Sequence, residues 1–308
     1  MHTLIVGTGA MACLFAARLA ETGIDVTMLG SWPEGLSALR SNGIRLLDLS
    51  GNERCYHVQV LDEAKYGVHF SEAVVLVKSW QTARVASQLE ICLDTSGIAL
   101  TLQNGLGNYE TLVGALGPER VALGVTTMAA RLIEPGYVQH TGEGKVTLGM
   151  HPRLVNLREA MTKSGFQVES NPDPQSLLWG KLVINASINP LTAILGITNG
   201  ELLAQADIRE LLHEIATEAE FIAYHKGVRL PYPDPIDMVE QVAMNTAANR
   251  SSMLTDILNG RATEIDAING AIVQAGEEAG VPTPVNRVLW QLVRGLDSLS
   301  GRKENEDR

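Results

Sequence analysis

The first thirty residues of the chain constrain its fold more than any other stretch. A short β-rich run at residues 3–6 is followed at once by a glycine-containing turn, and an apolar helical segment then runs from about residue 11 to residue 22. A second β-rich run follows at residues 25–29. Strand, glycine turn, helix and strand in this order predict a βαβ unit, whose two strands lie parallel in one sheet. We therefore expect an α/β protein.

The turn between the first strand and the helix carries the pattern of a dinucleotide-binding site. Gly7, Gly9 and Ala12 occupy the three positions of a G-x-G-x-x-G/A fingerprint. A side chain at Gly7 would obstruct the tight turn, and one at Gly9 would block the approach of a pyrophosphate to the backbone N–H groups that begin the helix. The residues expected to bind the cofactor here are Gly7, Thr8, Gly9, Ala10, Met11 and Ala12.

The end of the second strand does not show which dinucleotide is bound. NAD enzymes usually place Asp or Glu at this point, and NADP enzymes place an Arg nearby. This chain has Gly30, Ser31 and Trp32 there, and Arg40 is the nearest later cation. A missing carboxylate would not repel a 2′-phosphate, so the residues leave both cofactors open.

Two later apolar runs extend the predicted parallel sheet. Residues 73–77 and 98–102 are continuously apolar, which is typical of strands covered by helices on both faces. Lys78 follows the first run directly, and Asn104 follows the second within a Gln-Asn-Gly turn. Open α/β sheets bind ligands beyond the carboxyl ends of their strands. Lys78 and Asn104 are therefore candidates for the cofactor site.

The rest of the first half is expected to complete the same domain. Residues 121–148 alternate apolar and polar side chains between turn sequences, which predicts an antiparallel extension of the sheet. A helix at 154–164 and a strand at 166–168 follow, and Asn-Pro-Asp-Pro at 171–174 is the expected linker. We expect a Rossmann-type domain at residues 1–172.

Helical periodicity dominates the second half, which we expect to form a helical domain at residues 173–300 with a polar tail at 301–308. Breaks at glycine and proline clusters separate the predicted helices. These helices span residues 176–195, 205–226, 236–248, 255–278 and 285–299.

The predicted helix at 176–195 carries three polar side chains on one face. Lys181, Asn185 and Asn189 recur at every fourth residue, so they project from the same side of an otherwise apolar helix. A buried ammonium is costly unless a partner compensates it, so this Lys suggests a ligand or a carboxylate nearby. The alternative is a solvated stripe on a surface helix.

The predicted helix at 255–278 offers the carboxylate. Glu264 lies among apolar residues and either faces Lys181 or belongs to a solvated face. Just before this helix, Ser252 is a candidate N-cap.

Charge and composition limit the partners of the chain. The formal net charge of −11 argues against nucleic acid or an anionic membrane as a partner. The apolar run at residues 10–20 is broken by Arg18 and is too short to span a bilayer, and the N-terminus lacks the basic region of a signal peptide. The three cysteines have no metal-site or disulfide spacing. We expect a cytoplasmic protein that holds no metal and acts on a small molecule.

Short motifs in this order and spacing connect the chain to one family. They lie at residues 7–11, 76–81, 103–107, 181–185, 189–193, 199–202, 251–253 and 263–266. With these motifs the chain resembles the ketopantoate reductase (2-dehydropantoate 2-reductase) family along nearly its whole length. The resemblance implies NADPH-dependent reduction of the 2-oxo group of ketopantoate to pantoate, a step towards pantothenate and coenzyme A.

The resemblance also implies roles for individual residues. Lys181 is the general acid beside the ketone, and Glu264 holds the substrate and supports the Lys. The residues that match substrate-binding positions are Lys181, Asn185, Asn189, Asn199, Ser252 and Asn104. Those that match positions at the cofactor, besides the glycine turn, are Ser31, Lys78, Asn104 and Glu264.

Ser31 departs from the family pattern, which often has an Arg at this position for the 2′-phosphate of NADPH. NADH therefore stays open beside NADPH. A paralogous reductase of another small 2-oxo acid is the alternative within the family. A nucleotide-binding sensor without catalysis is a further alternative, and the presence of both Lys181 and Glu264 argues against it. A homodimer through the helical domain is compatible with the sequence.

Overall fold

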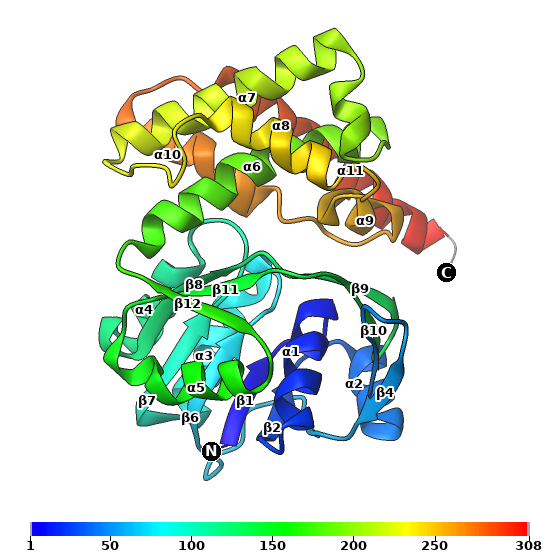
Figure 1. Cartoon of the computed structure of the whole chain (residues 1–308), viewed down its shortest axis with the longest axis vertical. Coiled ribbons are helices and arrows are strands. Elements are labelled where there is room, and N and C mark those ends of the chain that lie inside the picture. Colours follow the sequence, from blue (N-terminus) through cyan, green and yellow to red (C-terminus); the bar gives the residue numbers. More distant parts are fainter. Residues whose placement is uncertain (1, 307–308) are drawn as a thin grey trace. The chain divides into compact units, whose positions relative to one another are not determined.

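The computed structural model describes residues 2–306, with side chains up to residue 299, and its contacts divide the chain into two units. The first unit comprises the residues up to Gln103 together with Asn108–Pro174, and it contains the sheets (Figure 1). The second unit comprises Asn104–Gly107 and the chain from Gln175, and it is helical. The predicted fold class, an α/β dinucleotide-binding half followed by a helical half, is confirmed.

The βαβ unit forms as predicted. Strand β1 (His2–Val6) pairs in parallel with β2 (Asp25–Leu29), and helix α1 (Ala10–Glu21) connects them. The middle of α1 is buried on all sides, because the helix packs against β1 and β2 on one side and against strands of a second sheet on another. Such burial explains why the segment is apolar all round rather than amphipathic.

The large sheet has eight strands in the order β12-β11-β8-β7-β6-β1-β2-β5. Its pairs are parallel except for β8 with β11, which is antiparallel. The strands not yet defined are β5 (Gln59–Leu61), β6 (Phe70–Val75), β7 (Leu93–Thr101), β8 (Val121–Thr126), β11 (Lys145–Gly149) and β12 (Gln167–Asn171). The other helices of this unit are α2 (Pro33–Asn42), α3 (Thr82–Cys92), α4 (Asn108–Leu116) and α5 (Val155–Lys163).

The expected antiparallel extension of the large sheet is wrong for one hairpin. Strands β9 (Ala129–Glu134) and β10 (Tyr137–Gly142) join a separate four-stranded sheet with β3 (Ile44–Leu47) and β4 (Glu53–Tyr56). Strand β10 pairs in parallel with β3 and antiparallel with β9. This small sheet packs on α1 through β3, β9 and β10, and it covers apolar helix surface that the large sheet leaves uncovered.

The second unit is built from helices around one apolar core. These helices are α6 (Pro174–Leu195), α7 (Ala206–His225), α8 (Pro235–Asn245), α9 (Ser252–Leu258), α10 (Ala271–Ala279) and α11 (Pro284–Glu306). In the part of the chain that the structure describes, no helix has the length and apolar character needed to span a bilayer.

The helix predicted at residues 255–278 is interrupted. Helix α9 ends at Leu258, and Gly260 adopts a φ of +65°, which a helix cannot continue through. A non-helical stretch, a π-helical turn at Asp266–Gly270 and then α10 follow. The stretch is held by Thr263, whose hydroxyl donates to the Asp297 carboxylate of α11 at 2.8 Å. We had expected Glu264 to lie on a regular helix, and this prediction is wrong.

The N-cap of α9 is one residue earlier than predicted. The Ser251 hydroxyl accepts a hydrogen bond from the Leu254 N–H at 3.0 Å, and Ser251 is buried. Ser252 is the first residue of the helix and is exposed, so it does not cap it.

Candidate active site

The glycine turn of the first unit fits a pyrophosphate. Gly7 has a φ of +129°, and a Cβ atom there would lie 3.2 Å from the Leu76 carbonyl oxygen. At Gly9 nothing lies within 4 Å of the position a Cβ would take, and no side chain caps the start of α1 at this residue. The helix therefore begins beside open space, where its first N–H groups can donate hydrogen bonds to phosphate oxygens. Thr8 is buried in this turn, and Ala10 and Met11 begin the helix.

Packing explains the missing carboxylate after β2. A Cβ atom at Gly30 would lie 2.5 Å from Cγ2 of Thr8, so a side chain at this position would collide with the glycine turn. An Asp or Glu at the first position after the strand would therefore require the Thr8 side chain to move, and the next residue is Ser31.

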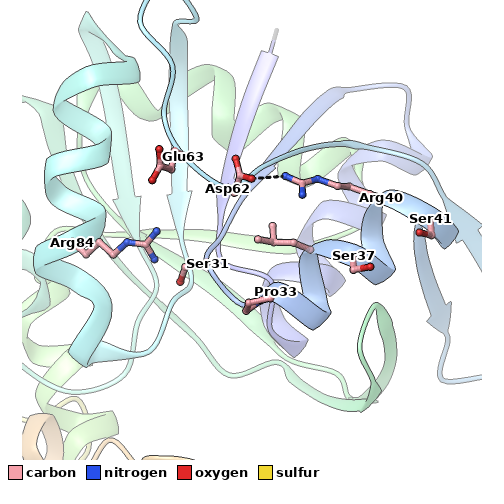
Figure 2. Close-up of a pocket in the computed structure, with 9 residues that line it drawn as sticks. Ser31, Pro33, Ser37, Arg40, Ser41, Asp62, Glu63 and Arg84 are labelled. Atoms are coloured by element: carbon pink, nitrogen blue, oxygen red, sulfur yellow. Dashed lines mark ion pairs between the residues drawn. The ribbon is translucent and has the colours of Figure 1, made fainter.

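Ser31 lies in a pocket of about 610 Å³ at this end of the sheet (Figure 2). Arg40 of α2 pairs with Asp62, which directly follows β5, at 3.1 Å. Figure 2 shows Arg84 of α3 extending towards Ser31 from the other side of the pocket. The residues that line the pocket are Ser31, Pro33, Leu36, Ser37, Arg40, Ser41, Asp62, Glu63 and Arg84.

Lys78 follows the end of β6 in a segment held by buried hydrogen bonds. The Gln103 amide donates to the Val77 carbonyl at 3.0 Å and to the Thr82 hydroxyl at 2.8 Å. Thr82 in turn donates to the Asn108 side chain at 2.7 Å. These bonds fix the chain on both sides of Lys78, whose side chain is partly buried.

In the second unit, α6 places the polar stripe in a buried setting. Asn189 is 7% exposed, and Lys181 and Asn185 are partly buried. The neighbouring residues Leu182 and Val183 belong to the core of the unit. The alternative of a solvated stripe on a surface helix is therefore wrong.

Lys181, Glu264 and Asn104 are brought together in this unit. Burial lowers the pKa of Lys181 to about 8, and the Glu264 carboxylate acts in the opposite direction by favouring the charged ammonium. Glu264 is itself only 7% exposed. The Asn104 side-chain amide donates to the Glu264 carboxylate at 3.5 Å. Together they form an acid whose pKa is lowered to about 8, a buried carboxylate and an amide beside them.

Asn199 and Ser252 belong to segments at the C-terminal end of α6. The Asn199 N–H donates to the Asn249 carbonyl at 3.0 Å, and the Thr192 hydroxyl of α6 donates to Ser251 at 2.7 Å. The Asn199 side-chain amide donates to the Thr246 hydroxyl at 2.9 Å, while its buried Oδ1 has no hydrogen-bond partner. This orphaned oxygen leaves Asn199 able to accept one more hydrogen bond.

Three residues at or near the site were not found from the sequence. Asp62 and Arg84 line the pocket beside Ser31. Asp62 follows the end of β5 and Arg84 lies in the first turn of α3, and these positions could have suggested that both residues lie near a ligand. Asn269 lies in the π-helical turn after Glu264. The only related feature of the sequence is Pro190, which predicts a missing hydrogen bond within α6 but does not show which side chain replaces it.

Comparison with known families agrees with this architecture over both units. The family described as Ketopantoate reductase PanE/ApbA matches residues 3–153. Its C-terminal domain, described as Ketopantoate reductase PanE/ApbA C terminal, matches residues 173–297. The chain belongs to the ketopantoate reductase family. It is accordingly an oxidoreductase of a family that uses a nicotinamide dinucleotide.

Individual relatives within and near the ketopantoate reductase family span almost the whole chain. A 2-dehydropantoate 2-reductase from Archaeoglobus fulgidus is 35% identical, with 96% of this chain and 97% of the relative covered. The solved structure of a PanE/ApbA family ketopantoate reductase from Ralstonia eutropha is 30% identical with a TM-score of 0.90, covering 97% and 99% of the two chains. A D-mandelate dehydrogenase solved with NADH and anilino(oxo)acetate is 25% identical with a TM-score of 0.93, at the same coverage.

Proposed function

We propose that this protein reduces the 2-oxo group of 2-dehydropantoate (ketopantoate) to the hydroxyl of pantoate, with NADPH as the hydride donor and Lys181 as the general acid. The observation that carries the proposal is that the buried Glu264 carboxylate acts electrostatically on Lys181, a Lys of lowered pKa on an otherwise apolar helix. The near full-length similarity to 2-dehydropantoate 2-reductases supports the choice of substrate.

The residues of the second unit match what the reaction requires. When bound, the reduced nicotinamide supplies a hydride to the ketone carbon, which leaves negative charge on the ketone oxygen. The Lys181 ammonium donates its proton to this oxygen, and the neutral amine then takes a proton from solvent. Glu264 keeps the amine protonated before the reaction. Asn185 and Asn189 present amide groups from the same helix face to the polar groups of the substrate.

The pocket beside Ser31 supports NADPH as the cofactor. The ribose of a dinucleotide lies beyond the second strand of this fold, where β2 ends. Arg84 and Arg40 supply positive charge there, and Ser31 and Ser37 supply hydroxyl donors, which suit a 2′-phosphate. The Asp62 carboxylate competes with the phosphate for Arg40.

Replacing Arg84 with Gln is expected to raise KM for NADPH about 10-fold and to leave KM for NADH unchanged, because only NADPH carries the 2′-phosphate. Steady-state kinetics with both cofactors measures this. Asp62→Asn is the matched control of opposite sign, since it releases Arg40 and should lower KM for NADPH. Equal effects of Arg84→Gln on the two cofactors would show that the pocket does not bind the phosphate.

Reduction of a different 2-oxo acid is the second candidate function. The similarity to the D-mandelate dehydrogenase solved with NADH favours it, because Lys181 and Glu264 would serve any 2-oxo acid in the same way. The two candidates differ in the groups that contact the side chain of the substrate.

The experiment that separates these candidates is a cofactor-oxidation assay with purified protein. Ketopantoate, phenylglyoxylate and small aliphatic 2-oxo acids are each tested with NADPH and with NADH. We expect the highest kcat/KM for ketopantoate with NADPH. A preference for another acid would assign the chain to a paralogous activity, and no oxidation with any acid would contradict the proposal.

A further inference from the structure

Helix α6, which carries Lys181, contains a proline in its interior. Pro190 has no N–H, so the carbonyl of Ala186 one turn earlier loses its normal helical hydrogen bond. Ala186 is fully buried, and an unpaired carbonyl there would be costly. The side-chain amide of Asn269 fills this gap by donating to the Ala186 carbonyl oxygen at 3.0 Å.

Asn269 is held rigidly by its other contact. Its Nδ2 also donates to Oδ1 of Asn286 at 3.0 Å, and both side chains are fully buried. Asn286 donates in turn to the Glu218 carboxylate of α7 at 2.9 Å. Because the Ala186 carbonyl can only accept, the orientation of the Asn269 amide is determined by its partners.

The segment that contains Asn269 also carries the site. Glu264 lies two residues before the π-helical turn Asp266–Gly270, in which the Gly270 N–H donates to the Ile265 carbonyl at 2.9 Å. Single π-helical turns often occur at functional sites. A hydrogen bond fixed within this turn therefore constrains the position of Glu264 a few residues away.

The loop with Asn104 rests on the same turn. The Leu106 N–H donates to the Ala267 carbonyl at 2.9 Å. A Cβ atom at Gly105 would lie 2.4 Å from that carbonyl oxygen, so the loop approaches the turn as closely as a glycine allows. One segment, residues 264–270, thus holds Glu264, supports Asn104 and is fastened to the Lys181 helix at Ala186.

We propose that Asn269 is a positioning residue for the active site, and that Pro190 exposes the main-chain acceptor it uses. The hydrogen bond from Asn269 to Ala186 fixes the distance between the Glu264 segment and the helix that carries Lys181. The functional meaning of this contact rests on the proposed role of Lys181 as the acid. The contact itself can be tested by its effect on the Lys181 amine. The carboxylates along this chain of bonds are Glu264, which acts on Lys181, and Glu218, which binds the start of α11.

The test combines a deletion with a backbone rescue. Asn269→Ala removes the side-chain donor, and Pro190→Ala in the same chain supplies a main-chain N–H that can pair with the Ala186 carbonyl. Pro190→Ala alone is the control, because it keeps Asn269. For each variant and for Glu264→Gln, the thermal unfolding midpoint is measured. The pKa of the Lys181 amine is measured by competitive acetylation with mass spectrometry, together with the pH profile of kcat/KM.

We expect Asn269→Ala to lower both the unfolding midpoint and the pKa of Lys181, the latter by about half a pH unit or more and in the same direction as Glu264→Gln. The double variant should regain most of the unfolding midpoint but keep the lowered pKa and a reduced kcat. If Asn269→Ala does not fold, the double variant alone decides.

Recovery of both properties in the double variant would overturn the proposal, since Asn269 would then only satisfy a buried carbonyl. An unchanged Lys181 pKa in the folded Asn269→Ala protein would overturn it as well. Failure of the wild-type protein to reduce ketopantoate would instead contradict the proposed function, and the acetylation result would still decide the role of Asn269.

Discussion

Replacing Lys181 with Ala is expected to lower kcat for ketopantoate reduction about 10³-fold, within the range typical for loss of a general acid. In the proposed reaction the ammonium protonates the oxygen of the reduced ketone, and burial lowers the pKa of this ammonium to about 8. NADPH binding should persist, because the glycine turn and the Ser31 pocket belong to the first unit. Steady-state kinetics and cofactor fluorescence measure the two effects separately.

Lys226→Ala is the matched control for this prediction. Lys226 also lies in the second unit, but it forms a surface ion pair with Glu278 at 2.6 Å. Its removal should leave kcat unchanged, since exposed ion pairs contribute little. If Lys181→Ala kept kcat within a few-fold of wild type, Lys181 would not be the acid.

Replacing Glu264 with Gln is expected to lower kcat/KM at neutral pH by about 10- to 100-fold, the effect of losing a charge-assisted contact of about 1.5–3 kcal/mol. The pH dependence of kcat/KM should show the direction in which Glu264 shifts the pKa of Lys181. The Glu264 carboxylate raises the pKa of Lys181 against the effect of burial, so without it the pKa falls below about 8. The alkaline limb of kcat/KM, where the ammonium loses its proton, should therefore move to lower pH.

The activity deficit of Glu264→Gln should accordingly be smaller near pH 6 than near pH 8, where more of the Lys is neutral in the variant. Glu277→Gln is the control, since Glu277 pairs with Arg287 at the surface. A Glu264→Gln profile parallel to that of wild type at every pH would show that the carboxylate does not control the protonation of Lys181.

Local features of the sequence were sufficient for the framework of the fold. The βαβ unit is encoded within residues 2–29, because its glycines, its apolar helix and its strands are neighbours in the chain. The stripe of Lys181, Asn185 and Asn189 is equally local, since helical geometry alone sets their common face. Both features were predicted without reference to any distant contact.

Features that depend on distant pairing were not predicted. Strand β10 joins β3 across more than ninety residues, Tyr137 opposite Arg45, and hydrophobic alternation gives no information on which sheet a strand enters. The interruption between α9 and α10 was missed because apolar residues continue at helical spacing through it. The Asn259-Gly260 pair was a turn signal that could have revealed it.

The contacts between the residues of the site were the feature that the sequence predicted least well. The sequence identified Lys181 and Glu264 as chemically suitable, but their interaction depends on the stretch around Thr263 and on the π-helical turn. The role of Asn269 could not be inferred, because it depends on a carbonyl eighty-three residues earlier in the chain.

The loop Asn104–Gly107 has a consequence for how genes of this family can recombine. It is flanked on both sides by residues of the first unit, yet it belongs to the second. A crossover between two paralogous genes near codon 174 would combine the loop of one parent with the Ala267 turn of the other. Glycine at position 105 and the turn that it approaches must therefore be inherited as a compatible pair, although they are far apart in the sequence. A chimera joined at this point is therefore expected to fold only when the loop and the turn of its two parents are compatible.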